Sequence, residues 1–336
     1  MATKQRAQED VQEVTEELTE EQTLLSRLDD PDAGARQLAI MALEDVATPA
    51  AVERLIAAVK DTDPTVRRLA VGLLEDLGDG RAAPALIAAL EDAHPPVREA
   101  ASAALRELRD PAAADALLGA LANPRVEVRR PIILALRELR DERATVALIA
   151  ALTDPEVDVR REAVVTLAYL RTPDAIPGLQ GRLKDQDAGV RRLALGALAF
   201  FHGPALAGEF IAALTDPDWQ VRAEAAIVLG RTALGQAIPA LLGALRDDFW
   251  QVQKEAIIAL GRLHAAAAVP ALIGLLAAAV PDLRRSAASA LGELGAREAL
   301  EPLARLSNDP DAEVKKAASR ARTAIESAPP SPRTAQ

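Results

Sequence analysis

A valine–arginine dipeptide returns along the chain at one fixed interval. Neighbouring copies are always 31 residues apart, as from Val66 to Val97. A period of about 20–50 residues indicates a solenoid, a propeller or another repeat array. Because an array grows by adding units, the length of 336 residues does not predict several globular domains. The ten copies are Ala35-Arg36, Val66-Arg67, Val97-Arg98, Val128-Arg129, Val159-Arg160, Val190-Arg191, Val221-Arg222, Val252-Gln253, Leu283-Arg284 and Val314-Lys315.

Each unit carries the apolar spacing of two helices. From Val159, apolar residues recur at Ala163, Leu167 and Leu170, which lie on one face of a helix. Asp154-Pro155 in front offers an N-cap oxygen and a proline at the first helical position, so a helix is predicted over 155–170. A second stripe at Ile176, Leu179 and Leu183 predicts the first helix of the next unit.

Neither helix can bury its apolar stripe alone, so neighbouring units must stack. The sequence therefore predicts an all-α protein, a right-handed α-solenoid of about ten helix-turn-helix units. Within a unit we name the first helix A and the second helix B. Residues 1–18 are expected to form an acidic N-terminal capping segment, residues 19–325 a single solenoid, and residues 326–336 a disordered tail rich in Pro and Ser.

The pattern of Asp-Pro, four residues and Arg, followed by helices rich in Ala and Leu, resembles the HEAT repeat. More narrowly, it is similar to the short HEAT-like units named after phycobilisome lyases, over residues 19–325. The resemblance implies that helix B lines the concave surface. It does not select a function, because HEAT-like arrays include scaffolds, adaptors, lyase subunits, a metal-dependent hydroxylase and DNA glycosylases.

Composition narrows the classes of function. The chain has no cysteine, which excludes disulfides and thiolate catalysis by its own residues. Its net charge of −11 disfavours binding to nucleic acid and to anionic membranes. Residues 1–21 lack the apolar core of a signal peptide, so a cytoplasmic protein is expected.

Catalytic groups are scarce. The three histidines are His94, His202 and His264, and the last two hold the same place in units that are two apart. No histidine is followed by glutamate, so the His-Glu pairs that hold iron in the HEAT-like hydroxylase are missing. The sequence favours a protein without catalytic residues, metal or cofactor.

Aspartates stand five residues before most of the repeated valines. The resemblance implies that these aspartates and the repeated arginines bridge adjacent units, as a structural ladder that includes Asp154, Arg160, Asp185, Arg191, Asp216 and Arg222. The alternative is a basic stripe that binds an acidic ligand. The ten positions are Asp30, Asp61, Asp92, Asn123, Asp154, Asp185, Asp216, Asp247, Ala278 and Asp309.

The aromatic residues, two Trp, one Tyr and four Phe, all lie between residues 169 and 250. Tyr169 and Phe200 stand ten residues after the valine, where other units carry charged side chains, so both are expected to be exposed. Trp219 and Trp250 match each other in the first turn of helix B, and Phe249 precedes the second. Their alternative role is packing at repeat junctions.

These observations predict a non-catalytic scaffold that holds a partner protein on its concave helix-B surface. The expected contact residues are Tyr169, Phe200, Trp219, Phe249, Trp250, Arg231 and Arg262. One alternative, invited by the family name, is a bilin or tetrapyrrole lyase subunit or chromophore chaperone acting with a partner subunit. A second is a nucleic-acid-binding HEAT-like protein, which the acidic charge disfavours.

Two further segments differ from the corresponding segments of the other repeats. Pro131 lies within the predicted helix B of the fourth unit and is expected to bend it. Helix A over residues 265–279 lacks charged side chains, which makes its outer face a candidate surface for self-association.

Overall fold

A computed structural model describes residues 20–201 and 204–327, and this part of the chain is helical and has no strand. The chain divides into two compact units, Met1–Thr172 and Pro173–Gln336, each of which is described by itself. The expected capping segment over residues 1–18 and His202 lie outside the described residues.

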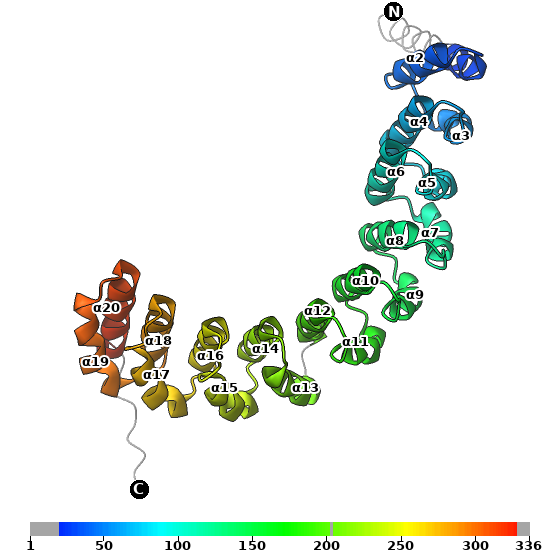
Figure 1. The fold of residues 1–336 in the computed structure, drawn as a ribbon. Helices are drawn as coiled ribbons and strands as arrows, with labels where there is room; N and C mark the ends of the chain where they lie inside the picture. The colour runs from blue at the N-terminus through cyan, green and yellow to red at the C-terminus, as the bar shows by residue number, and fades with distance from the viewer. Residues whose placement is uncertain (1–19, 202–203, 328–336) are drawn as a thin grey trace, which may run out of the picture. The chain divides into compact units, whose positions relative to one another are not determined.

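In the first unit, B helices form one layer and A helices a second (Figure 1). Residues 20–26 are helical and lead into the first B helix. The B helices are α2 (Ala33–Leu43), α4 (Pro64–Leu77), α6 (Pro95–Glu107), α8 (Val126–Leu139) and α10 (Val157–Leu170). The A helices are α3 (Val52–Ala58), α5 (Ala83–Ala89), α7 (Ala114–Ala120) and α9 (Ala144–Ala151), and the 3₁₀ turns are η1 (Arg27–Asp29), η2 (Pro49–Ala51), η3 (Gly80–Ala82) and η4 (Pro111–Ala113).

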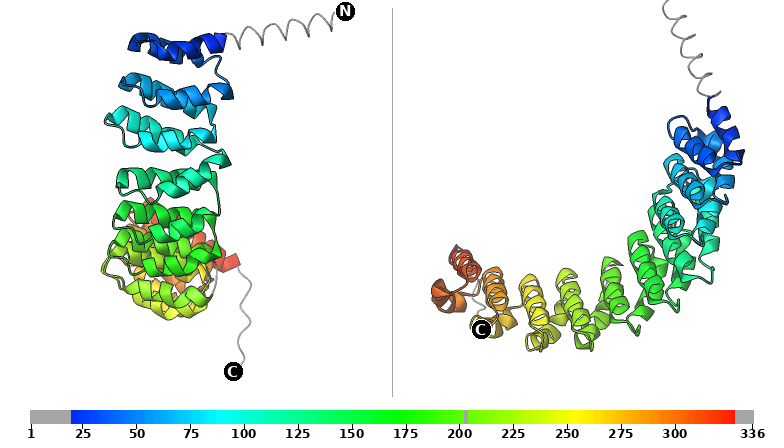
Figure 2. Two further views of the ribbon diagram at one scale, coloured as in Figure 1. Left: turned by 90° about the vertical axis from the view of Figure 1, so that its right-hand side faces the viewer. Right: turned by 45° about the horizontal axis from the view of Figure 1, so that its top comes forward.

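The second unit repeats this two-layer arrangement (Figure 2). Its B helices are α12 (Ala188–Leu198), α14 (Trp219–Arg231), α16 (Trp250–Arg262), α18 (Pro281–Glu293) and α20 (Ala312–Ser327). Its A helices are α11 (Ile176–Arg182), α13 (Ala207–Ala212), α15 (Ile238–Ala244), α17 (Val269–Leu275) and α19 (Leu300–Arg305). The 3₁₀ turns are η5 (Pro173–Ala175), η6 (Ala199–Phe201), η7 (Pro204–Leu206), η8 (Ala213–Thr215), η9 (Gly235–Ala237), η10 (Ala266–Ala268), η11 (Arg297–Ala299) and η12 (Leu306–Asn308).

The core of each unit lies between the two layers. Its side chains are almost all Ala, Val, Leu and Ile, and the repeated valines are buried, as at Val66 and Val252. Each helix buries one apolar stripe against its neighbours, which is the packing of an α-solenoid. The predicted fold class is confirmed within each unit. At the C-terminal end α20 continues to Ser327, so residues 326 and 327 are helical and do not belong to the expected tail.

The start of the B helices differs from the prediction in one respect. Asp154 does not cap α10, because its Oδ1 accepts the N–H of Glu156 and the helix begins at Val157. Its carboxylate is already engaged by Arg129, which holds it away from the first helical turn. The N-cap is the residue three before the repeated valine, where five aspartates accept helical N–H groups: Asp32, Asp63, Asp187, Asp218 and Asp311.

Neighbouring B helices approach closely in the second unit. A Cβ atom placed on Gly230 of α14 would lie 2.8 Å from the Cα atom of Ala259 of α16. A Cβ on Gly292 of α18 would lie 2.9 Å from the Cα atom of Ala321 of α20, and one on Gly261 would lie 3.3 Å from the Cα atom of Ala290 and 2.7 Å from the Glu293 carboxylate. Because only a hydrogen fits at Gly230 and Gly292, the B helices are in backbone-to-backbone contact there.

The B helices end in a residue with left-handed backbone at the same place in several repeats. Gly78 and Gly295 hold it with φ of 62°, but Arg140, Arg171, Ala233 and His264 also adopt positive φ there. A side chain with a Cβ is strained in this conformation, whereas glycine is not.

We therefore expect Ala233→Gly to raise the free energy of unfolding of the second unit by about 0.5–1 kcal/mol, because it relieves a φ of 54°. Gly78→Ala is the converse change in the first unit and is expected to destabilise by a similar amount. Urea titrations followed by circular dichroism measure both. A lower midpoint for Ala233→Gly than for the unmodified chain contradicts the prediction.

Candidate functional site

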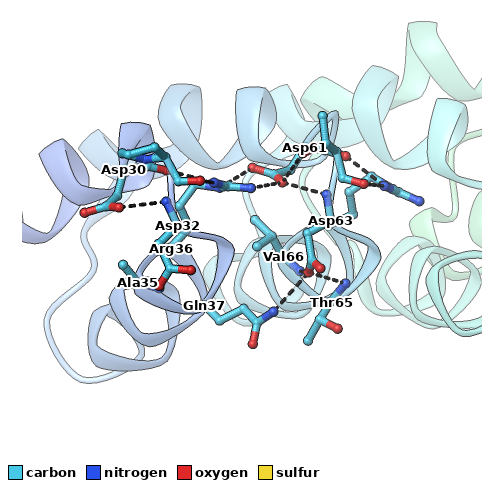
Figure 3. Close-up of polar contacts among 12 residues, drawn as sticks. Asp30, Asp32, Ala35, Arg36, Gln37, Asp61, Asp63, Thr65 and Val66 are labelled. Atoms are coloured by element: carbon cyan, nitrogen blue, oxygen red, sulfur yellow. Dashed lines mark hydrogen bonds and ion pairs between the residues drawn. The ribbon is translucent and has the colours of Figure 1, made fainter.

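Arginine side chains bridge successive repeats along one edge of the array. Arg36 donates from Nε and Nη2 to the two carboxylate oxygens of Asp61, both at 2.7 Å (Figure 3). Its Nη1 donates to the backbone carbonyls of Asp30 and Pro31 in its own repeat. One guanidinium thus ties the loop before its own helix to the corresponding loop of the next repeat, and the two parallel bonds fix its orientation.

The same bidentate pair recurs wherever the next repeat of the same unit carries the aspartate. Nitrogen–oxygen distances of the two bonds are 2.6–2.9 Å, and the side chains are only 5–13% exposed. Arg160 donates to the carbonyl oxygens of Asp154 and Pro155, and Asp185 accepts a bond from Arg182. The recurring pairs are Arg67–Asp92, Arg129–Asp154, Arg191–Asp216, Arg222–Asp247 and Arg284–Asp309.

Among the described residues within each unit, two seams lack the ion pair. At one of them both partners are replaced, since Gln253 stands for the arginine and Ala278 for the aspartate, and the Gln253 amide donates to the carbonyl of Asp247 at 2.6 Å. At the other, Arg98 keeps its bonds to the carbonyls of Asp92 and Ala93, but the next repeat offers Asn123. In the ion-paired rungs the guanidinium donors are used within the chain, so this edge is not a free basic stripe.

The exposed aromatic residues fall in both units, and each is described within its own unit. Tyr169 lies near the end of α10 in the first unit, 44% exposed, with the guanidinium of Arg140 5.2 Å from its ring centroid. Phe200 lies in the second unit, 41% exposed, with the guanidinium of Arg231 5.9 Å away. Each ring therefore has a cation above one face and solvent on another side.

A second group of rings lies at the opposite end of the B helices. Trp219 begins α14 and stacks on Phe249 with centroids 5.7 Å apart and planes at 9°, and Arg222 lies 5.6 Å from the Phe249 centroid. Trp250 begins α16 and is 37% exposed. Along α14, Trp219 and Arg231 are separated by about 18 Å at 1.5 Å per residue. We call Trp219, Phe249 and Trp250 the tryptophan cluster.

Phe249 occupies the N-cap position of α16, where five other repeats place an aspartate. No side chain caps this helix, and the absence of a cap costs about 1 kcal/mol. The stacking of Phe249 on Trp219 of the preceding repeat offsets part of this cost. Phe249 is nonetheless 43% exposed, so the tryptophan cluster combines junction packing with an accessible apolar surface.

The B-helix face of the second unit carries cations without ion pairs. Arg192, Arg231 and Arg262 are exposed, and within the described residues none of them forms an ion pair. Phe200, Arg231 and Arg262 hold the same place in three successive repeats, Phe200 in the turn η6 that follows α12 and the two arginines at the ends of α14 and α16. The half-buried Ile227 and Ile258 lie one turn earlier in α14 and α16. We call these six residues the arginine face.

A half-buried carboxylate lies beside this face. Glu224 of α14 is desolvated by its neighbours, and this burial raises its pKa above the usual value. The nearby charges of Arg192 and Arg231 act in the opposite direction, while Glu255 adds to the rise. Sequence reasoning missed Glu224, because its neighbourhood depends on how α12 and α14 are juxtaposed. The glycine opposite it, Gly196, was the available signal, since a Cβ there would lie 3.5 Å from the Glu224 carboxylate.

The structure describes both the uncharged helix A, which is α17, and Pro131 of the fourth repeat. In α17 Leu272 is buried and Ile273 and Leu275 are half-buried, while Pro270, Ala271 and Gly274 are exposed, so its outer face is apolar and built mostly of small groups. Pro131 lies inside α8, which continues past it to Leu139.

Among the described residues, no group of three His, Asp or Glu side chains is arranged to hold a metal ion. Within the same ranges, no helix combines the length and the apolar character needed to cross a membrane. Two clefts of about 310 and 320 Å³ lie in the same register beside the Arg129–Asp154 and Arg191–Asp216 pairs, so they are features of the repeat seams. A third, of about 340 Å³, lies between α18 and α20.

Stacked helix pairs joined by a recurrent arginine–aspartate ladder define an α-solenoid repeat protein. A family model described as HEAT repeats matches residues 21–106, 83–165, 145–208 and 207–289, and one described as PBS lyase HEAT-like repeat matches residues 283–309. The chain belongs to the HEAT-repeat family. A comparison with curated protein sequences finds no match.

Solved structures with a similar fold share little sequence. A crystal structure of an engineered protein is 23% identical with a TM-score of 0.50, covering 92% of this chain and 99% of that one. A structure of Kap95p with RanGDP is 14% identical with a TM-score of 0.62, covering 91% and 48%. The Escherichia coli protein YibA is 18% identical with a TM-score of 0.52, covering 86% and 96%. At these identities the likeness concerns the fold alone.

Proposed function

We propose that this chain is a non-catalytic scaffold that holds a partner protein on the B-helix face of its second unit. The observation that carries the proposal is the exposed ring of Phe200 beneath Arg231, on a face with two further arginines that have no ion pair among the described residues. Aromatic and arginine side chains dominate the energy of protein interfaces. A folded monomer gains little stability from leaving them exposed and without carboxylate partners.

The tryptophan cluster and Tyr169 with Arg140 are proposed as secondary contacts. Kap95p, which has a similar fold, acts by binding another protein, RanGDP, and this supports the class of function proposed here. The repeat named after phycobilisome lyases matches residues 283–309, whereas the exposed rings lie between residues 169 and 250. Nothing in the described aromatic groups favours a bilin over a protein partner.

Capture from an extract of the source cells tests the proposal. We expect Phe200→Ala combined with Arg231→Ala to reduce the bound partner at least about tenfold, because the two side chains form one contact unit. The matched control is Val146→Ala on the A-helix layer, which also removes an exposed apolar side chain, 78% exposed, and is expected to change nothing. If the double variant retains every partner that the unmodified chain captures, the proposed surface is wrong.

A further inference from the structure

The arginine face has two parallel rows with different chemistry. One row is Phe200, Arg231 and Arg262, at the same place in successive repeats, with Phe200 in the turn η6 and the arginines at the ends of α14 and α16. The second row, Ile227 and Ile258, lies four residues earlier in α14 and α16, about 6 Å away along each helix. Packed helices are about 8–10 Å apart, and the Gly230–Ala259 contact places α14 and α16 at the lower end of that range. Each of the two helices thus presents one arginine and one isoleucine, and the two pairs are about 8–10 Å apart.

This spacing matches one side of an α-helix. Residues seven apart in a helix lie about 10 Å apart on the same face, and a helix can present an acidic stripe beside an apolar stripe. A helix laid across α14 and α16 would therefore meet Arg231 and Arg262 with carboxylates at i and i+7. Its apolar stripe would cover Ile227, Ile258 and the ring of Phe200.

We infer that the arginine face binds an acidic amphipathic helix of the partner protein, with carboxylates seven residues apart on Arg231 and Arg262. This inference rests on the proposed function and adds the chemical class of the partner. The arginines of this face have no ion pair among the described residues, so a ligand carboxylate displaces no intramolecular partner. Two carboxylates supply the charge complementarity that fixes register and orientation.

Nucleic acid fits the same face poorly. The chain carries a net charge of −11, and the carboxylates of Glu224 on α14 and Glu255 on α16 lie beside the face. Binding to a phosphate backbone depends on cations that neutralise the phosphates, and neighbouring carboxylates oppose this attraction. The apolar row of Ile227 and Ile258 also has no role against phosphates.

A change at Glu224 is expected to strengthen binding, whereas changes at the arginines are expected to weaken it. Its charge acts on both Arg192 and Arg231, so it weakens the attraction of the face for an acidic ligand. Glu224→Gln removes this charge and keeps the shape of the side chain. We expect it to strengthen binding of an acidic helix about two- to fivefold, whereas a purely apolar docking surface would not respond to it.

The probe is a fluorescently labelled synthetic peptide of about three heptads, helical, with one Glu and two Leu per heptad and Ala and Gln elsewhere. Fluorescence anisotropy measures its affinity for the full chain. We expect Arg231→Gln and Arg262→Gln each to weaken binding about five- to tenfold, and added salt to weaken it further. The control is Arg246→Gln, an exposed arginine at the end of the A-helix layer, which is expected to leave the affinity unchanged.

Three results would overturn the inference. These are equal binding of a peptide with Lys in place of Glu, equal effects of Arg262→Gln and Arg246→Gln, and tighter binding of a single-stranded DNA oligonucleotide than of the acidic peptide. If the acidic peptide does not bind while partner capture still depends on Phe200 and Arg231, the partner is not an acidic amphipathic helix and the scaffold function stands. If capture is also independent of these residues, the proposed function falls with it.

Discussion

Asp216→Ala is expected to lower the free energy of unfolding of the second unit by about 3 kcal/mol, since it leaves a mostly buried guanidinium without its carboxylate. Arg191 donates two bonds of 2.8 Å to Asp216, and both side chains are about nine-tenths buried. Removing Asp216 also removes the acceptor for the backbone N–H of Asp218 at the start of α14. Urea titration measures the loss through tryptophan emission, which comes only from Trp219 and Trp250 in neighbouring helices.

The same carboxylate makes stability depend on pH. Burial by itself raises the pKa of Asp216, but the bonds from Arg191 and the Asp218 N–H outweigh it and hold the pKa below the usual value. A carboxyl with a depressed pKa in the folded state contributes stability above its unfolded pKa, about 3.9, and loses it as the pH falls through the folded value. The difference between the unmodified chain and Asp216→Ala is therefore expected to shrink below about pH 4.

The chain contains a natural control for this prediction. The seam at Gln253 and Ala278 lacks both charged partners. The double variant Arg191→Gln with Asp216→Ala gives the Arg191–Asp216 seam the same two residues, so it also removes the guanidinium that Asp216→Ala leaves unpaired. We expect the double variant to be more stable than Asp216→Ala alone, because an unpaired buried charge costs more than the loss of the pair. Additive losses from the two single variants would contradict this account of the ladder.

The repeat spacing was enough to predict the solenoid and the register of its helices. A period of 31 residues with a valine, a flanking arginine and an aspartate in fixed places leaves little freedom in how the units stack. The start of α10 was predicted two residues too early, at 155, since the carboxylate of Asp154 is shared between the turn and Arg129 of the preceding repeat. A contact between repeats of this kind is invisible to local capping rules.

The candidate site was less accessible to prediction. Alignment of the repeats places Trp219 at the start of helix B and Phe200 near its end, but it does not show that Phe249 stacks on Trp219 or that Arg231 lies over Phe200. Glu224 was missed for a related reason, because its environment comes from Arg192 on the neighbouring helix. Periodicity gives the position of a residue within its unit, whereas function here depends on which positions meet across helices.

Gly230→Val is the second change with a large expected effect. A Cβ on Gly230 would lie 2.8 Å from the Cα atom and 2.9 Å from the Cβ atom of Ala259, and the closer of these is backbone that cannot rotate away. The branched side chain therefore has to push α14 and α16 apart. Overpacking of this kind costs about 3 kcal/mol, measured as a lower urea midpoint of the second unit.

Gly243→Val is the matched control, because a Cβ at this exposed glycine of α15 meets nothing within 4 Å. We expect it to change the free energy of unfolding by no more than about 0.5 kcal/mol. The two variants carry the same substitution in the same unit and differ only in the helix contact. Equal destabilisation by both would show that the close approach of α14 and α16 is not what stabilises this seam.

The same contact sets the geometry of the arginine face. Gly230 and Gly261 directly precede Arg231 and Arg262, so a wider gap between α14 and α16 also widens the distance between the two guanidinium groups. A helical ligand with carboxylates seven residues apart cannot stretch to follow them. Under conditions where circular dichroism shows the variant folded, we expect Gly230→Val to lower the affinity for the acidic peptide at least about fivefold. Gly243→Val is expected to leave this affinity unchanged. Unchanged affinity in the folded Gly230→Val variant would mean that helix spacing does not select the ligand.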